Sequence, residues 1–181
     1  MKGNFPACLT FTLKHEGGLA NVTGDPGGLT NKGITLKTFN LLFPRAGGAE
    51  GLRTITDEQV NIIYDAGYWM SVQGDALPIG VDLVVFDFAV NAGPGRSIVM
   101  LEAVAGTARD GIDGPLTEAA IAKQDPGVVI DKLTNLHEAF YRADPDFDEF
   151  GGGWLARLAD CRTEALAMVG TANAASSKKS P

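Results

Sequence analysis

The chain has 181 residues, with a hydrophobic fraction of 45% and a charged fraction of 20%. These values are typical of a single globular domain and exclude a disordered chain and a membrane protein. Its 22 acidic and 15 basic residues give a net charge of −7, which argues against a protein that binds nucleic acid through its phosphates. Cys8 and Cys161 have no CxxC spacing, so two buried thiols are the simpler interpretation and a bridge between them is the alternative.

The amino-terminal segment is not typical of a secretory signal peptide. Residues 5–13 are interrupted by Pro6 and two threonines, and no small-residue cleavage site follows. The longest apolar run, residues 81–92, is too short to span a bilayer. We therefore expect synthesis in the cytoplasm without a signal peptide and no membrane insertion.

Helical periodicity dominates the chain. From Phe5 onward, mostly apolar residues recur at steps of three and four and predict one face of a first helix, with Glu16 at its end. Gly17-Gly18 ends this helix. Residues 19–35 are rich in Gly, Asn, Asp and Pro and predict a loop or a small hairpin region. Further helices are predicted over residues 36–43, 57–69, 81–91, 96–105, 115–123, 126–142 and 154–169.

The predicted fold class is mainly α, with a small β or loop insertion after the first helix. A capping box at residues 56–59 opens one helix, and Gly151-Gly152-Gly153 is expected to be a break before the last. The helix at 81–91 is apolar nearly all round and is therefore expected in the centre of the domain. We predict one domain over residues 1–170 and a flexible tail over 171–181.

Glu16 is the first candidate for catalysis. It lies on the apolar face of the first helix, in the last turn. Loss of solvation and the negative end of the helix dipole both favour the protonated form of such a carboxyl group, which is the form that a general acid uses. The alternative is a local structural role, such as pairing with Lys14 or with a loop amide.

Asp25 supplies a second carboxylate, in a Gly-Asp-Pro-Gly-Gly turn where it would be solvated and ionised. Glycoside hydrolysis needs two such groups, one to protonate the leaving oxygen and one to act on water or on the developing cation. The hydroxyl of Thr30 or the amide of Asn31 would hold that water. The alternative for Asp25 is the common role of a turn residue before proline.

The chain contains several ordered motifs, FTLKHEGG at 11–18, DPGGLTNKGIT at 25–35, YW at 68–69, GDALP at 74–78, VFDFAVNAGP at 85–94 and DGIDGPLT at 110–117. These motifs resemble glycoside hydrolase family 108, the bacterial and phage N-acetylmuramidases. The similarity runs from about residue 5 to about residue 165. The segment at 110–117 is similar to the part of these proteins described as a predicted peptidoglycan-binding region.

The resemblance implies a lysozyme-like fold of two lobes around a groove, which hydrolyses the β-1,4 bond between N-acetylmuramic acid and N-acetylglucosamine. It assigns the catalytic acid to Glu16. The interval from Glu16 to Asp25 also resembles the Glu/Asp/Thr triad of phage-type lysozymes. The threonine of that pattern would fall at Asn31, and Thr30 comes one residue early, so the water-positioning role stays open between the two.

Five residues within the family motifs are candidates for substrate binding, and Asn31 is one of them. Asp87 and Asn91 lie one turn apart on the central helix and either line the sugar groove or tie helices together, because buried polar groups need hydrogen-bond partners. Tyr68 or Trp69 would stack on a sugar ring, although aromatic residues at helical spacing more often belong to the core.

These features together predict a peptidoglycan hydrolase of the endolysin type, which lyses the bacterial cell wall. Residues 1–90 would form the catalytic part and residues 91–170 a second helical lobe. We expect a monomer that binds peptidoglycan glycan strands, uses no metal or cofactor, and depends on a separate holin or release system to reach the wall. The alternatives are a lytic transglycosylase and a non-catalytic peptidoglycan-binding or secretion-helper protein.

Overall fold

The computed structural model describes residues 2–21, 28–112 and 114–177. The chain divides into two compact units. The division falls inside the first helix and inside a short π-helical segment. The first, here called the sheet unit, is Leu9–Gly67, and the second, the helical unit, combines Met1–Cys8 with Tyr68–Pro181.

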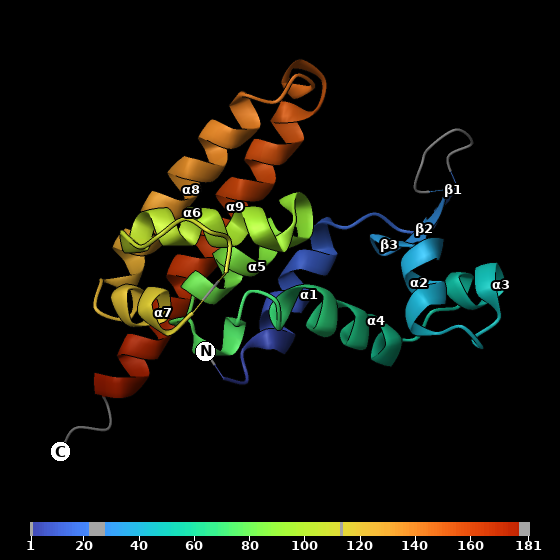
Figure 1. Ribbon diagram of the computed structural model, residues 1–181, viewed down its shortest axis with the longest axis horizontal. Helices are drawn as coiled ribbons and strands as arrows, with labels where there is room; N and C mark the ends of the chain where they lie inside the picture. Colours follow the sequence, from blue (N-terminus) through green and yellow to red (C-terminus); the bar gives the residue numbers. More distant parts are fainter. Residues whose placement is uncertain (1, 22–27, 113, 178–181) are drawn as a thin grey trace. The chain divides into compact units, whose positions relative to one another are not determined.

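The sheet unit contains the β insertion that the sequence predicts after the first helix. Three short antiparallel strands lie in the order β1-β2-β3, with Ala20 opposite Thr30 and Asn31 opposite Ile34. Helices α2 and α3 lie beside this sheet (Figure 1). The elements are α1 (Phe5–His15), which begins in the helical unit, β1 (Ala20–Asn21), β2 (Leu29–Asn31), β3 (Ile34–Thr35), α2 (Leu36–Leu42), α3 (Gly48–Arg53) and α4 (Asp57–Tyr64).

Local caps set the start of two of these helices. The hydroxyl of Thr35 accepts a hydrogen bond from the backbone N–H of Thr38 at the start of α2. The predicted capping box at α4 is confirmed, since Thr56 and Gln59 exchange side-chain and backbone hydrogen bonds. The helix predicted over 57–69 corresponds to α4 followed by one π-helical turn, Asp65–Trp69.

The helical unit is built around α5. Every residue from Val81 to Ala89 is buried, and the helix contacts α6, α8 and α9 (Figure 1). This confirms the prediction of an apolar central helix. The elements are a 3-10 turn at Gly74–Ala76, α5 (Val81–Ala92), α6 (Pro94–Ala105), α7 (Pro115–Ile121), α8 (Pro126–Arg142) and α9 (Phe147–Ser177).

The last helix differs from the prediction at both ends. α9 begins at Phe147 and continues through the three glycines that were expected to form a break, and it extends to Ser177. A Cβ on Gly151 would lie 2.5 Å from the ring of Phe147, so glycine gives that ring its space. Packing of α9 against α8 offsets the low helix propensity of glycine. The described part of the predicted tail is therefore helical.

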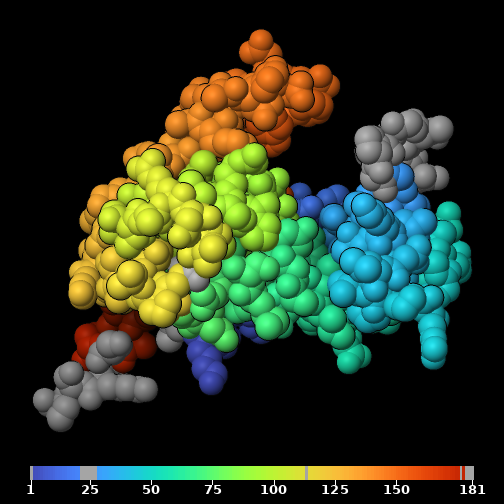
Figure 2. All heavy atoms as spheres, viewed as in Figure 1, coloured from blue at the N-terminus to red at the C-terminus, as the bar shows by residue number. Residues whose placement is uncertain are grey.

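α8 and α9 form an antiparallel pair within the helical unit. Figure 2 shows the end where they are joined, coloured orange, extending beyond the neighbouring α5 and α6.

Among the described residues, no helix is both long enough and apolar enough to cross a bilayer.

The two cysteines follow the simpler interpretation. Cys8 and Cys161 are both buried and both free. Burial raises the pKa of each thiol, so both stay protonated and unreactive near neutral pH.

Candidate functional site

The carboxyl group of Glu16 lies immediately after α1. The backbone N–H of Glu16 still donates to the carbonyl of Thr12, at 3.2 Å, and its side chain is half-buried. The carboxyl group packs against the turn between β2 and β3, where an ideal Cβ on Gly33 would lie 2.5 Å from Oε2 and 3.1 Å from Cδ. Only glycine leaves room for the Glu16 side chain at this position.

The β2–β3 turn is a tight two-residue turn. Lys32 has φ 49° and Gly33 has φ 72°, the pair of positive angles that a two-residue hairpin turn requires. For a lysine this conformation costs about 1 kcal/mol. An ion pair between Lys32 Nζ and Asp57 Oδ1, at 2.8 Å, holds the lysine, and this hydrogen bond lowers the pKa of Asp57.

Tyr64 holds the same turn from the end of α4. Its side chain is 2% exposed, and its hydroxyl donates to the carbonyl of Lys32 at 2.8 Å. The same hydroxyl oxygen would lie 2.7 Å from a Cβ on Gly33. Glu16 and Tyr64 therefore both pack over one glycine, and α1, the hairpin turn and α4 converge there.

The sequence analysis did not identify this role for Gly33 or Tyr64. The signal present in the sequence was Lys32-Gly33 between two short strands, because a glycine at the second position is typical of such turns. The contribution of Tyr64 depends on a fold that brings α4 to the turn, and no local pattern encodes it.

The predicted partners of Glu16 have different surroundings. Asp25 lies outside the described residues. Thr30 is half-buried in the central strand. Asn31 is 9% exposed, and its amide Nδ2 donates to the carbonyls of Leu52 at 2.9 Å and Arg53 at 3.3 Å. Asn31 therefore ties β2 to the end of α3.

Asp87 forms a buried ion pair in the helical unit. It is 5% exposed, and Arg157 donates to both of its carboxylate oxygens, from Nη2 at 2.8 Å and from Nε at 3.1 Å. Of the two alternatives for this residue, the structure favours the one in which Asp87 ties helices together, here α5 and α9. Asn91 is exposed, and its Nδ2 donates to the backbone carbonyl of Asp87 at 2.7 Å.

Trp69 lies in the core, which is the alternative given for the aromatic candidates. It is 3% exposed, its ring packs against Phe5 and Phe86, and its Nε1 lies 3.3 Å from Asp75 Oδ1. Tyr68 is half-buried, so its side chain is partly accessible.

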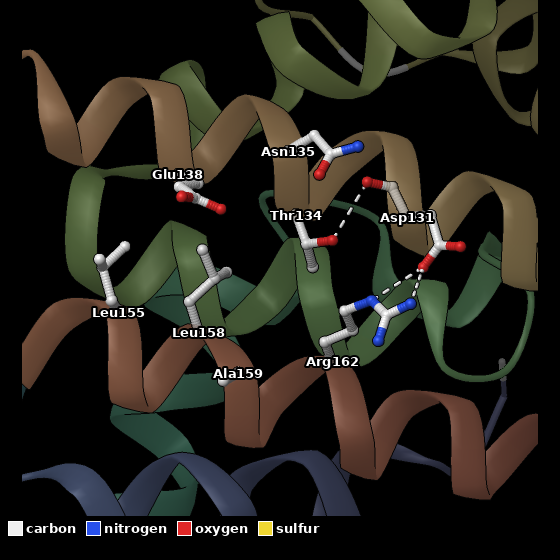
Figure 3. Close-up of a pocket in the computed structure, with 8 residues that line it drawn as sticks. All are labelled: Asp131, Thr134, Asn135, Glu138, Leu155, Leu158, Ala159 and Arg162. Carbon is white, nitrogen blue, oxygen red and sulfur yellow. Dashed lines mark hydrogen bonds and ion pairs between the residues drawn. The ribbon is translucent and has the colours of Figure 1, made fainter.

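A groove of about 420 Å³ lies between α8 and α9 (Figure 3). Polar side chains of α8 face leucines of α9 across it. Its charged groups have local partners: Arg162 pairs with Asp131 at 2.7 Å, and Glu138 pairs with Arg142 at 2.7 Å. The groove therefore offers a ligand no uncompensated charge.

His137 is buried beside the central helix. Its ring stacks on Phe88 at 3.7 Å, and its Nε2 has no hydrogen-bond partner among the described residues. Burial lowers the pKa of His137 to about 3, so the imidazole is neutral near pH 7. Within the described ranges, no group of three or more His, Cys, Asp or Glu side chains is placed to hold a metal ion.

Comparisons with known proteins identify a family and similar solved structures. The family model described as Glycosyl hydrolase 108 matches residues 9–93, a range that includes Glu16, Gly33 and Tyr64. The solved structure titled "Structure of Brucella abortus SagA" is 36% identical, has a TM-score of 0.82, and aligns over 93% of this chain and 97% of that chain. No curated protein matches. The predicted mainly α, lysozyme-like fold is confirmed.

Proposed function

This chain belongs to the glycosyl hydrolase 108 family, and on that premise we propose that it is an N-acetylmuramidase. Family membership makes it a glycoside hydrolase that acts on peptidoglycan. The bond we propose is the β-1,4 bond between N-acetylmuramic acid and N-acetylglucosamine. The observation that carries the proposal is the placement of the Glu16 carboxyl group over Gly33, with the Tyr64 hydroxyl beside it.

In this proposal Glu16 is the general acid. It passes its proton to the glycosidic oxygen as the bond from that oxygen to the anomeric carbon breaks. Asp25 stabilises the positive charge that develops on the sugar or takes a proton from the attacking water, whose hydroxyl group adds to the anomeric carbon. The close packing of Glu16 on the hairpin turn supports this role, because a general acid must be held at a fixed position relative to the bond it cleaves.

We assign the positioning of the water to Thr30. The amide hydrogens of Asn31 are donated to two backbone carbonyls of α3, whereas the hydroxyl of Thr30 is on a half-buried side chain of the opposite strand face. Tyr68 remains a candidate for stacking on a sugar. We further propose that the enzyme acts as an endolysin, which reaches the wall after a separate system opens the membrane.

The mass of the digestion products tests this function. Purified sacculi are incubated with the full chain, and the released fragments are analysed by mass spectrometry. A muramidase gives fragments with reducing N-acetylmuramic acid ends. A lytic transglycosylase gives 1,6-anhydro ends that are lighter by one water, and a non-catalytic protein binds the sacculi and releases no fragments. Either of the last two results would contradict the proposal.

A further inference from the structure

A second pocket in the helical unit has an aromatic wall and a mixed set of polar groups. Its volume is about 210 Å³. This is smaller than the roughly 300–1,000 Å³ of pockets for drug-sized ligands, so it suits a group about as large as one amino acid or one sugar. Asn91 and Arg96 line it from the α5–α6 corner, and Phe140, Tyr141, Asp144 and Trp154 line it from the joined ends of α8 and α9.

The aromatic rings form one continuous surface. The rings of Tyr141 and Trp154 are 5.7 Å apart and tilted by 32°, and the ring of Phe140 is 5.7 Å from that of Tyr141. Trp154 is half-buried, so part of this surface is open to a ligand. It would pack against the aliphatic part of whatever group enters.

The hydroxyl of Tyr141 has no hydrogen-bond partner among the residues that the structure describes. The residue is 8% exposed, and burial raises the pKa of its phenol, so the hydroxyl stays protonated. The carbonyl oxygen of Asn91 likewise accepts no hydrogen bond in the described part of the chain. These two groups can bind the polar edge of a ligand.

The pocket also carries one positive and one negative charge, and the described residues place neither of them in an ion pair. The guanidinium of Arg96 lies over the ring of Phe140, 4.7 Å from its centroid, and donates to the carbonyl of Ala92 at 3.0 Å. The carboxylate of Asp144 accepts a hydrogen bond from the backbone N–H of Asp146 at 3.0 Å. Over the described ranges, no ion pair joins Arg96 and Asp144 to each other or to another side chain.

Two ion pairs beside α9 differ from this arrangement, Asp87 with Arg157 and Asp131 with Arg162. A neutral sugar would cover Arg96 and Asp144 without compensating either charge, which is unfavourable. A group that carries an anion and a cation at one end would compensate both.

We propose that this pocket binds a zwitterionic amino-acid group. Its carboxylate contacts Arg96, its ammonium contacts Asp144, and its aliphatic part lies on Trp154. Peptidoglycan offers such a group where a stem peptide contains diaminopimelate, whose side chain ends in an amine and a carboxylate. The identification of the ligand with peptidoglycan rests on the proposed function, whereas the binding of a zwitterion does not.

Titration of the full chain, followed by NMR, tests the proposal. The probe is the stem tripeptide L-Ala-γ-D-Glu-meso-diaminopimelate, and the reporter is the indole N–H signal of Trp154, which is assigned with Trp154→Phe. We expect a saturable shift. We expect three changes each to weaken binding by about tenfold or more. They are amidation of the carboxylate at the side-chain end of diaminopimelate, Arg96→Gln and Asp144→Asn.

The matched control is Arg109→Gln, which removes the same charge from an exposed arginine of the same unit outside the pocket. It should leave the affinity unchanged. A shift with tetra-N-acetylchitotetraose but none with the tripeptide would overturn the proposal in favour of a sugar pocket. No shift with the tripeptide at millimolar concentration would also overturn it. Because no bond is cleaved in this titration, its outcome is independent of whether the chain is a muramidase.

Discussion

Glu16 in the sheet unit and Asp87 in the helical unit are both carboxylates that follow the apolar pattern of a helix, yet their surroundings differ. Glu16 packs over Gly33 beside the hydroxyl of Tyr64, and its side chain is half-buried. Asp87 is almost fully buried and is held on both oxygens by Arg157. A guanidinium with two hydrogen bonds keeps a carboxylate ionised and fixed, which suits a structural role.

The comparison separates residues that hold the fold together from residues that surround the candidate catalytic group. In the helical unit, Asp87 and Trp69 have partners within the core, so their side chains hold the fold together. In the sheet unit, the turn at Lys32-Gly33 is strained and is tied by Tyr64 and Asp57. Strain that the surrounding structure holds in place is often found at functional sites.

Removal of the Asp87 carboxylate should have the largest effect on stability. Asp87→Ala removes the carboxylate that binds Arg157 through two hydrogen bonds, in a pair whose side chains are only 13% and 7% exposed, and we expect a loss of about 3–5 kcal/mol in the free energy of unfolding. The matched control is Asp131→Ala, which breaks the exposed pair with Arg162 and should cost about 0–1 kcal/mol. Urea unfolding measures both. Equal losses in the two variants would remove the distinction drawn for Asp87.

Gly33→Ala should damage both stability and activity. Its Cβ would meet Glu16 Oε2 and the Tyr64 hydroxyl, and φ is 72°, so we expect a loss of about 1–3 kcal/mol. Displacement of Glu16 should lower the lysis rate by about tenfold or more. Gly152→Ala is the control, because Gly152 lies inside α9 with open space around it. That change should raise the free energy of unfolding by about 0.5–1 kcal/mol. Full activity in Gly33→Ala would show that Glu16 does not depend on this packing.

The buried His137 should make the helical unit sensitive to acid. Its folded pKa of about 3 lies below the ordinary value of 6.5, so between these values the unfolded chain binds a proton that the folded chain does not. Stability should therefore fall as the pH drops from about 6.5 towards 3, with a contribution of up to about 1.4 kcal/mol per pH unit. His137→Phe, which keeps the ring against Phe88, should remove this part of the slope in urea unfolding at several pH values. An unchanged slope would contradict the burial of a neutral imidazole.

Tyr64→Phe should have a smaller effect that divides between stability and turnover. It removes the hydrogen bond to Lys32, which we expect to cost about 1 kcal/mol. Because the turn supports Glu16, kcat should fall severalfold while KM stays nearly unchanged. Tyr141→Phe is the stability control, since its hydroxyl has no partner among the described residues. A rise in KM alone would instead place Tyr64 in substrate binding.

Local sequence signals predicted most helices, but they missed α3 and the full extent of the last helix. The capping box that begins α4 uses only residues within four positions, so the sequence contains all of its information. Likewise, α8 begins at Pro126 and ends at Arg142 as predicted. The glycines at 151–153 favour a break locally, and the packing of α9 on α8 overrides that preference. The packing of α9 on α8 exists only in the folded protein, so local sequence signals do not reveal it.

The site could be predicted in part for the same reason. The motif around Glu16 made it the candidate general acid, because its place after an apolar helix face is a local property; its catalytic role stays a prediction. The roles of the other candidates depend on distant partners: Arg157 for Asp87, and the end of α3 for Asn31. The residues beside Glu16 come from the β2–β3 turn and from α4. Such pairings follow from tertiary structure, which spacing in one sequence does not specify.

The most direct test of the central claim is the rate of sacculus digestion by Glu16→Gln, compared with Glu58→Gln. Both changes remove one carboxylate from the sheet unit, and Glu58 is an exposed residue in the first turn of α4. Thermal unfolding of both variants establishes that each is folded. If Glu16 is the general acid, its variant digests sacculi at the background rate and Glu58→Gln retains the wild-type rate. Digestion by folded Glu16→Gln at the wild-type rate would contradict the claim.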